Sequence, residues 1–163
     1  MNMKSLFALA LLITSLSSFA QDIFVIKKSM NPKNVLHYKV NVDNCKLKAP
    51  AISAYWIMGE EGGGQEVLSS KEKSYFQPKI SYSNSSEADF SIGAMEEMGS
   101  KIPDKSIRVR LENCKPKAFL EVNGTEVELK DIFVSVNFIM SVNYMNISGI
   151  SPNGAKITKK IQN

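Results

Sequence analysis

The stretch DNCKLKA at residues 43–49 has a near copy 69 positions later, ENCKPKA at residues 112–118. Each copy follows a segment in which apolar and polar residues alternate, as expected for a β-strand with one buried face. The copies contain the only two cysteines of the chain, Cys45 and Cys114. The repeat therefore predicts two equivalent strand ends, each continuing into a turn that carries a cysteine.

Two equivalent strand ends can lie at the same rim of a β-barrel, and a disulfide there needs Cα atoms about 4.4 to 6.8 Å apart. In an oxidising compartment two cysteines are more often paired than free. We therefore predict a disulfide between Cys45 and Cys114. The alternative is that the two NCK turns match by chance or by an old duplication, and that the thiols stay separate.

The N-terminal segment MNMKSLFALALLITSLSSFA, residues 1–20, has the features of a secretory signal peptide. The basic residue Lys4 precedes an apolar stretch, and Ser18 and Ala20 are the small residues before a cleavage point at Gln21. The apolar stretch is shorter than the ~20 residues that span a bilayer. We therefore expect cleavage near Ala20 and a periplasmic or secreted mature chain.

Length and charge fit one ordinary domain. Removing 20 of the 163 residues leaves 143, enough for a single core. The 20 basic and 16 acidic residues are scattered, without a run of five basic residues, which disfavours a nucleic-acid partner. We expect a signal peptide at residues 1–20 and one β domain at residues 21–163, with no stable membrane anchor. The sequence leaves the oligomeric state open.

Alternation with period two dominates the mature chain. The segment SIRVRL at residues 106–111 is one example, and Asn123-Gly124 lies between two more alternating runs as the centre of a type I′ hairpin. Further strands are expected at residues 23–27, 35–42, 51–58, 79–83, 88–94, 132–138, 141–148 and 155–161. One helix is expected within residues 65–75.

About ten short strands joined by turns predict an all-β, mainly antiparallel fold. We expect a closed or partly open β-barrel, calycin-like, of about eight to ten strands with at most one short helix. A β-sandwich is the alternative. A parallel α/β fold is disfavoured because its strands need helical crossovers of about a dozen residues, and there is room for one.

Residues able to carry catalysis are few. His37 is the only histidine, which excludes a zinc site with two or three histidines, and the cysteines lack zinc spacing. No Gly-x-Ser-x-Gly motif accompanies His37. The carboxylate pairs at residues 60–61 and 96–97 are explained as solvated neighbours. The sequence thus indicates no catalytic residue, no metal and no cofactor, and favours a protein that is not an enzyme.

Two features are candidates for binding a ligand. Tyr55 and Trp56 are strand neighbours, so that one faces the core and the other faces out or lines a cavity; core packing is the alternative. The second feature is a basic row of Arg108 and Arg110, with Lys39 at the position equivalent to Arg108 in the repeat. If that face lines a barrel, it could hold an anionic head group; a solvated outer face is the alternative.

Four segments resemble a known family: FVIKKSMNPKNVLHYKV at residues 24–40, PAISAYWIM at 50–58, VNGTEVELKDIFVSV at 122–136 and VNYMNISG at 142–149. They are similar to the secreted bacterial domain-of-unknown-function family numbered 4833. The resemblance covers nearly the whole mature chain and implies an envelope or periplasmic location in a Gram-negative bacterium. It supplies no catalytic residues.

Together these features predict a non-enzymatic periplasmic β domain that binds a small molecule or an envelope component. The alternative is a structural or protein-interaction module that adds a partner strand to an exposed sheet edge. A cavity in a closed barrel would favour the first function, and an open sheet with an uncharged edge strand would favour the second. A hydrolase that uses His37 ranks below both.

The mature protein should begin at Gln21, because signal peptidase cleaves after a small residue that follows the apolar stretch. The intact mass of the protein purified from its own compartment measures this directly. A chain that retained residues 1–20 would contradict secretion and, with it, the oxidising compartment on which the disulfide argument depends.

Overall fold

The computed structural model describes residues 19–59, 62–102, 104–139 and 141–163. Within these residues, eleven strands belong to one sheet, accompanied by short helices. The strands are β1 (Phe19–Lys28), β2 (Asn34–Asp43), β3 (Lys46–Met58), β4 (Gly64–Glu66), β5 (Lys79–Ser83), β6 (Glu87–Ser91), β7 (Ile107–Glu112), β8 (Lys115–Val122), β9 (Thr125–Val136), β10 (Val142–Ile150) and β11 (Lys156–Gln162). The helices are α1 (Ser70–Phe76), α2 (Gly93–Glu97) and the 3-10 helix η2 (Gly99–Lys101).

The sheet divides along strand β9. Glu128 in the first half of β9 pairs with β8 on one side and with β10 on the other. Ile132 in the second half also pairs with β10, but its other neighbour is β1, which runs parallel to β9. Strands β8 and β1 therefore share one edge of β9, one after the other, and the sheet opens into two parts beyond it.

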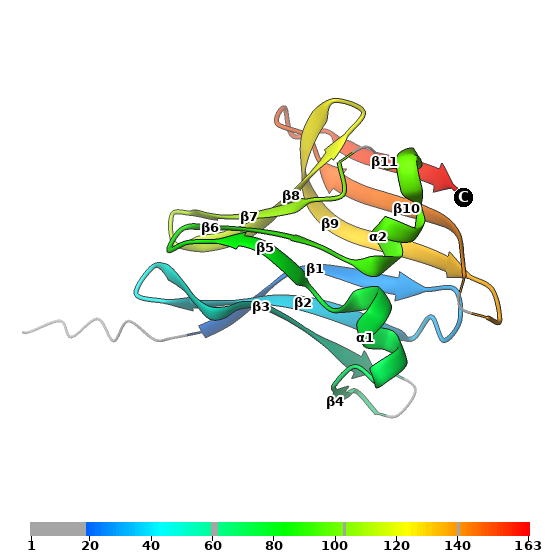
Figure 1. The fold of residues 1–163 in the computed structure, drawn as a ribbon. Coiled ribbons are helices and arrows are strands. Elements are labelled where there is room, and N and C mark those ends of the chain that lie inside the picture. The colour runs from blue at the N-terminus through cyan, green and yellow to red at the C-terminus, as the bar shows by residue number, and fades with distance from the viewer. Residues whose placement is uncertain (1–18, 60–61, 103, 140) are drawn as a thin grey trace, which may run out of the picture.

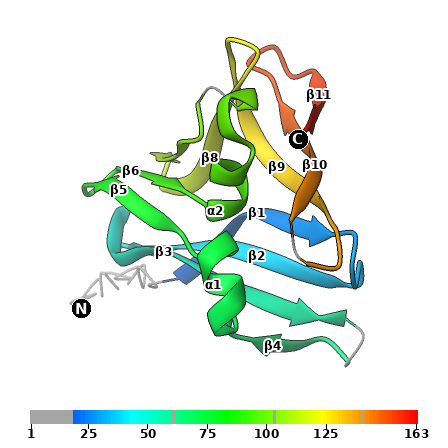
Figure 2. The same ribbon diagram turned by 45° about the vertical axis from the view of Figure 1, so that its right-hand side comes forward.

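These two parts form wings that lie face to face. The first wing consists of β1 to β4 and the second of β8 to β5, and Figure 1 shows the first below the second. Strands β10 and β11 extend the sheet from the other edge of β9. Figure 2 shows helices α1 and α2 along the side where the wings stay apart. The result is one strongly curled sheet, a half-barrel.

The expected all-β, mainly antiparallel and partly open barrel is confirmed. Three details differ from the expected elements. Strand β9 is continuous through residues 125–136, where two separate strands were expected. The expected strand at residues 88–94 ends at Ser91 and is followed by a second short helix, α2. The helix expected within residues 65–75 is shorter: residues 64–66 form strand β4 instead, and helix α1 begins at Ser70, after its N-cap Ser69.

The N-terminal strand overlaps the expected cleavage region. Strand β1 begins at Phe19, and Ala20 pairs with Asn41 of β2. The expected cleavage point before Gln21 therefore lies inside the first strand. Residues 1–18 of the expected signal peptide lie outside the described residues.

Aromatic side chains join the wings through the core. The rings of Phe24 and Tyr38, from the first wing, stack with centroids 4.5 Å apart. Phe90 of the second wing lies 6.2 Å from Phe24 and 5.9 Å from Tyr38. The Tyr38 hydroxyl donates a hydrogen bond to the carbonyl of Phe76, and burial raises the pKa of Tyr38 well above its ordinary value. The space between the wings at this level is thus filled by side chains.

The repeated sequence forms two hairpin turns. Asn44 and Cys45 join β2 to β3 with φ of 49° and 58°, and Asn113 and Cys114 join β7 to β8 with φ of 52° and 65°. Positive φ at both central residues is the requirement of a type I′ turn, and asparagine tolerates it better than most residues. Each copy of the repeat therefore encodes a tight hairpin with a cysteine at its tip.

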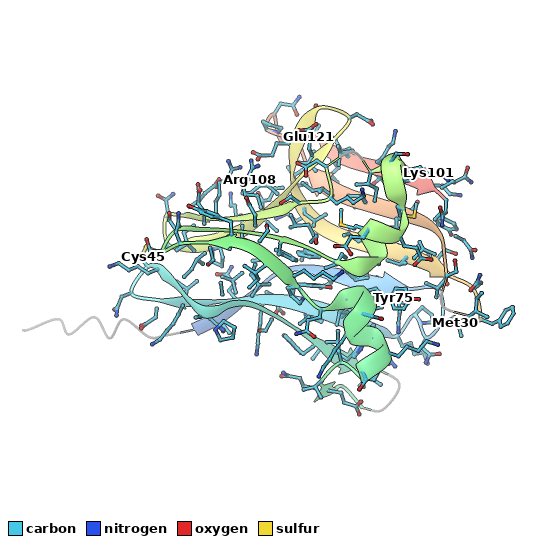
Figure 3. All side chains as sticks on the ribbon, in the orientation of Figure 1. Met30, Cys45, Tyr75, Lys101, Arg108 and Glu121 are labelled. Atoms are coloured by element: carbon cyan, nitrogen blue, oxygen red, sulfur yellow. A yellow bond between two sulfur atoms is a disulfide. The ribbon has the colours of Figure 1, made fainter. Side chains whose placement is uncertain are left out.

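The two hairpin tips meet. Cys45 and Cys114 are joined by a disulfide, with Cα atoms 4.7 Å apart, so the predicted bridge is confirmed. Nearby, the Leu47 N–H donates a 2.8 Å hydrogen bond to the carbonyl of Ser85 in the turn between β5 and β6. Figure 3 shows Cys45 at one end of the half-barrel and Met30 at the other. The disulfide thus holds the wings together at the end far from Met30.

Replacing both cysteines by alanine should lower the free energy of unfolding by about 4 kcal/mol, because the bridge closes a loop of 69 residues. The matched variant, Cys45→Gly with Cys114→Gly, should lose about 1 kcal/mol less, since glycine adopts positive φ without steric cost. Urea unfolding of both variants measures the difference. Equal losses would show that the turn conformation imposes no strain on these positions.

Candidate functional site

A pocket of about 240 Å³ lies at the end of the half-barrel opposite the disulfide. There β1 ends at Lys28, β2 begins at Asn34 and β3 ends at Met58. The segment from β4 to the first turn of α1 forms the remaining wall, with Glu66, Leu68 and Glu72 among the lining residues. The pocket is therefore built where three consecutive strands of the first wing meet a helix.

A capping box fixes the helical side of this pocket. The Ser69 side chain caps α1 by accepting a hydrogen bond from the Glu72 N–H at 3.4 Å. In return, Glu72 Oε2 accepts hydrogen bonds from the Ser69 N–H at 3.1 Å and from its hydroxyl at 2.8 Å. This reciprocal arrangement orders the helix start and holds the Glu72 carboxylate against the pocket.

Lys28 occupies the strand side of the pocket. Its ammonium group donates a 3.2 Å hydrogen bond to Glu72 Oε1, and its side chain is only 12% exposed. The same Nζ lies 4.2 Å from the centroid of the Trp56 ring and 5.7 Å from that of Phe76. A shielded cation over an aromatic face gains both Coulomb and cation–π energy. Lys28 is therefore held in place from two sides.

Trp56 lines the same pocket, beneath the ammonium group of Lys28. Its side chain is buried, and its ring meets Phe76 edge-on at 6.3 Å. The buried indole Nε1 has no hydrogen-bond partner among the described residues. A buried donor without an acceptor costs about 1 to 3 kcal/mol.

The partners of Glu72 lower the pKa of its carboxyl group. Burial raises its pKa, but the hydrogen bonds from Ser69 and Lys28 together outweigh burial and lower the pKa below its ordinary value of 4.5. The pocket thus presents an ion pair, an aromatic ring and the exposed carboxylate of Glu66 to a ligand. Such a set can exchange hydrogen bonds in both directions with a polar molecule.

Tyr55, the neighbour of Trp56, lies on the opposite face of β3. Its hydroxyl donates to Asp22 Oδ1 at 2.9 Å, and His37 Nδ1 lies 2.8 Å from the other oxygen of that carboxylate. Lys39 Nζ lies 5.0 Å from the Tyr55 ring. Burial, followed by the hydrogen bond and charge of Asp22, raises the pKa of Tyr55 to about 12. Tyr55 and Lys39 therefore belong to an outer-face cluster, separate from Trp56.

The arginines of the predicted basic row are paired with carboxylates. Arg108 Nη1 donates to Glu126 at 3.1 Å, and Arg110 bonds the other oxygen of Glu126. Arg108 Nε also lies 3.5 Å from Asp89. The alternating Val109 and Ile107 are fully buried, which places the arginines on the outer face of the second wing. This arrangement matches the solvated outer face that the sequence analysis gave as the alternative, and a role of Arg108, Arg110 and Lys39 in ligand binding stays a prediction.

Two other hollows have less chemistry to offer. One of about 300 Å³ lies between β3 and the C-terminal end of α1, lined by Ile52, Ala54, Leu68 and Pro78 among others. Another of about 450 Å³ lies over the outer face of β8 and β9, where the charged groups already pair with one another. Each is lined by a residue with a buried polar atom that lacks a partner, Ser53 Oγ in the first and Arg110 Nε in the second. The pocket beside Trp56 is the candidate site because it is lined by a shielded ion pair, Lys28–Glu72, packed on an aromatic ring.

Lys28 and Glu72 were missed as site residues by the sequence analysis, although both left signals. Phe24, Ile26 and Lys28 share one face of β1, so Lys28 is a cation at the end of an inward-facing row. The pattern Ser69-x-x-Glu72 is that of a capping box. Neither signal indicates by itself that the two side chains meet, because 43 residues separate them in the chain.

The fold and the pocket define a half-barrel β domain with a polar pocket at its rim. A family model described as a domain of unknown function, DUF4833, matches residues 24–160, and the chain belongs to this family. No curated protein and no solved structure matches the chain. Within the described residues, no helix has the length and apolar character needed to cross a membrane. The same residues contain no group of three His, Cys, Asp or Glu that could hold a metal ion.

The contacts of Glu72 should make stability depend on pH below 4.5. Since its folded pKa is lowered, the stabilisation is complete above the unfolded value and is lost as the pH falls through the folded pKa. Urea midpoints between about pH 6 and pH 3 measure this loss. Glu72→Gln keeps the hydrogen-bonding shape without the charge, and it should flatten this part of the profile. An unchanged profile would contradict the role of the Lys28–Glu72 pair.

Proposed function

We propose that this protein is a non-enzymatic binding module of the periplasm whose rim pocket holds a small polar molecule or the polar end of an envelope component. The observation that carries the proposal is the shielded Lys28–Glu72 pair packed on Trp56, whose indole N–H lacks an acceptor. Shielding a charged pair at the wall of a pocket costs stability, and a ligand that hydrogen-bonds to the pair would recover part of that cost.

The donor and acceptor set describes the ligand. The Lys28 ammonium group can donate hydrogen bonds to a ligand, whereas the carboxylates of Glu66 and Glu72 can accept them. Hydroxyl groups meet both needs, so a sugar unit of an envelope polymer or fragment fits better than a simple anion. The pocket is also smaller than the roughly 300 to 1,000 Å³ of sites that enclose a whole drug-sized molecule. It therefore suits one ring or one polar group of a larger molecule.

The periplasmic part of the proposal has two supports. The Cys45–Cys114 disulfide is the kind of bond that persists in an oxidising compartment. The expected signal peptide at residues 1–20 would deliver the chain there. Both fit the envelope location that the family resemblance implies.

The alternative function, addition of a partner strand at a sheet edge, is less well supported. Strand β11 carries Lys156, Lys159 and Lys160, and edge lysines disfavour strand pairing. Strand β4 has only three residues. Strand β5 has one charged residue, Lys79, but its pairing is interrupted between residues 80 and 82 by a bulge, which also blunts an edge. The pocket is therefore the better candidate.

Binding can be followed through Trp56, the only tryptophan of the chain. A panel of cell-wall fragments and envelope oligosaccharides should contain compounds that change its fluorescence emission. Lys28→Gln should weaken their binding by about tenfold or more, because a charge-assisted hydrogen bond in a shielded site is worth about 1.5 to 3 kcal/mol. Calorimetric titration supplies the dissociation constants.

The matched control is Lys27→Gln, which removes an exposed charge from the neighbouring position on the other face of β1. Its affinity should equal that of the unmodified protein. Thermal unfolding of each variant separates lost binding from lost folding. Unchanged Trp56 emission across the panel, or equal weakening by both substitutions, would argue against the pocket as the binding site.

A further inference from the structure

Three large apolar side chains are exposed at the end of the half-barrel that holds the pocket. Phe138 and Ile139, in the turn between β9 and β10, are 87% and 62% exposed. Met30, in the turn between β1 and β2, is 45% exposed. Soluble proteins seldom expose neighbouring apolar side chains to this degree without a partner. We call these three side chains the apolar tip.

The two turns are tied to each other by hydrogen bonds. The Ser29 N–H donates to the carbonyl of Val134 at 3.0 Å, and the Ser29 hydroxyl accepts from the Val136 N–H at 3.0 Å. The same hydroxyl donates a hydrogen bond to the carbonyl of Val136 at 3.3 Å. Figures 1 and 2 show the two connections side by side, and Figure 3 shows Met30 at that end. The tip is therefore one convex feature made from two hairpin ends.

Three backbone donors of the turn between β9 and β10 are paired within the turn. Asn137 Oδ1 accepts hydrogen bonds from the N–H of Ile139 at 3.1 Å and of Ser141 at 3.0 Å. The Asn137 N–H donates to the carbonyl of Ser141 at 3.0 Å. An apolar phase penalises unpaired backbone donors by several kcal/mol each. Each donor paired in this way lowers the penalty for moving the turn into such a phase.

We propose that the apolar tip inserts into the interfacial layer of a lipid bilayer and docks the protein reversibly on an anionic membrane surface. Residues 29–33 and 137–141 contain no acidic residue, and Lys33 follows Met30 in the same turn. Glu97 of α2 contacts the second turn, where its Oε1 accepts hydrogen bonds from the Ser141 hydroxyl and the Val142 N–H. Without residues 1–20 the chain has 19 basic and 16 acidic residues, so it keeps a net positive charge. A basic residue beside an apolar anchor adds attraction to anionic lipids.

A bilayer suits this tip better than a protein partner. The three side chains are exposed on turns and line none of the three hollows described above. A specific protein interface generally needs about 1,000 Å² or more of buried surface, beyond what three side chains provide. A bilayer interface accepts isolated apolar side chains and yields weak, reversible binding.

This inference goes beyond the proposed ligand. Asn31 lines the pocket and belongs to the same turn as Met30. Docking through the tip would therefore bring the pocket mouth close to the membrane surface, where envelope components are exposed. The tip side chains do not line the pocket, so membrane binding and ligand binding can be tested separately.

The mature protein should float with vesicles of phosphatidylglycerol and phosphatidylethanolamine, and much less with vesicles of phosphatidylcholine alone. Phe138→Ser combined with Ile139→Ser should lower the vesicle partition coefficient by about tenfold or more, since two large apolar anchors are removed. The control is Ile80→Ser with Tyr82→Ser, which removes two apolar side chains of 42% and 49% exposure from β5. This control should partition like the unmodified protein.

A second variant reports insertion directly. Phe138→Trp should shift its emission to shorter wavelength on addition of the anionic vesicles, whereas the buried Trp56 should not respond. No vesicle binding, or equal loss in the tip and β5 variants, would overturn the proposal. So would self-association in sedimentation velocity that the tip variant abolishes, which would assign the tip to a second copy of the chain. Sugar binding at the pocket stays intact in the tip variant in every case.

Discussion

The whole architecture depends on β9 serving two partners along one edge. Its first half pairs with β8 and its second half with β1, while β10 follows the other edge throughout. The change of partner coincides with a bulge at Lys130, which has no counterpart in β10. At this point Gly149 of β10 lies so close that an added Cβ would approach the Glu128 carbonyl to 2.7 Å. The close contact between β9 and β10 and the bulge together allow β9 to pair with β8 in its first half and with β1 in its second half.

The wings would diverge from β9 if nothing closed them. At one end the disulfide joins the hairpin tips of β2–β3 and β7–β8. Along the middle, Phe24, Tyr38 and Phe90 fill the space between the sheets. At the remaining end the pocket lies between the first wing and α1, and no residue of the second wing is among its lining residues. The site thus depends on how α1 packs against the ends of β1, β2 and β3.

The sequence predicted most strands because alternation reports directly on one-sided burial. It misplaced the boundary within β9 because the bulge at Lys130 shifts the phase of the alternation: Leu129 and Ile132 are both buried, although they are three residues apart. In the sequence alone, a break in the alternation of apolar and polar residues looks the same whether a bulge or a turn causes it. The same limit applies to α2, whose five residues are too short to show a helical period.

The candidate site was harder to predict than the fold. Alternation placed Arg108 and Arg110 on one face of β7 but did not pair them with Asp89 of the neighbouring β6 or with Glu126 of β9, two strands away. Trp56 was chosen as a candidate, yet its partners Lys28 and Glu72 come from β1 and α1. These contacts between side chains depend on the order of the strands in the sheet. The alternation of apolar and polar residues within one strand does not reveal the strand order around β9.

The position of the disulfide has a consequence for how the molecule responds to proteolysis. The bond spans residues 45–114, a segment that contains both α-helices and strands β4 to β6. A protease that cuts once anywhere within this segment leaves two pieces that remain covalently joined. The first wing and the second wing would then stay attached to the same covalent unit, and the nicked molecule would come apart only after reduction.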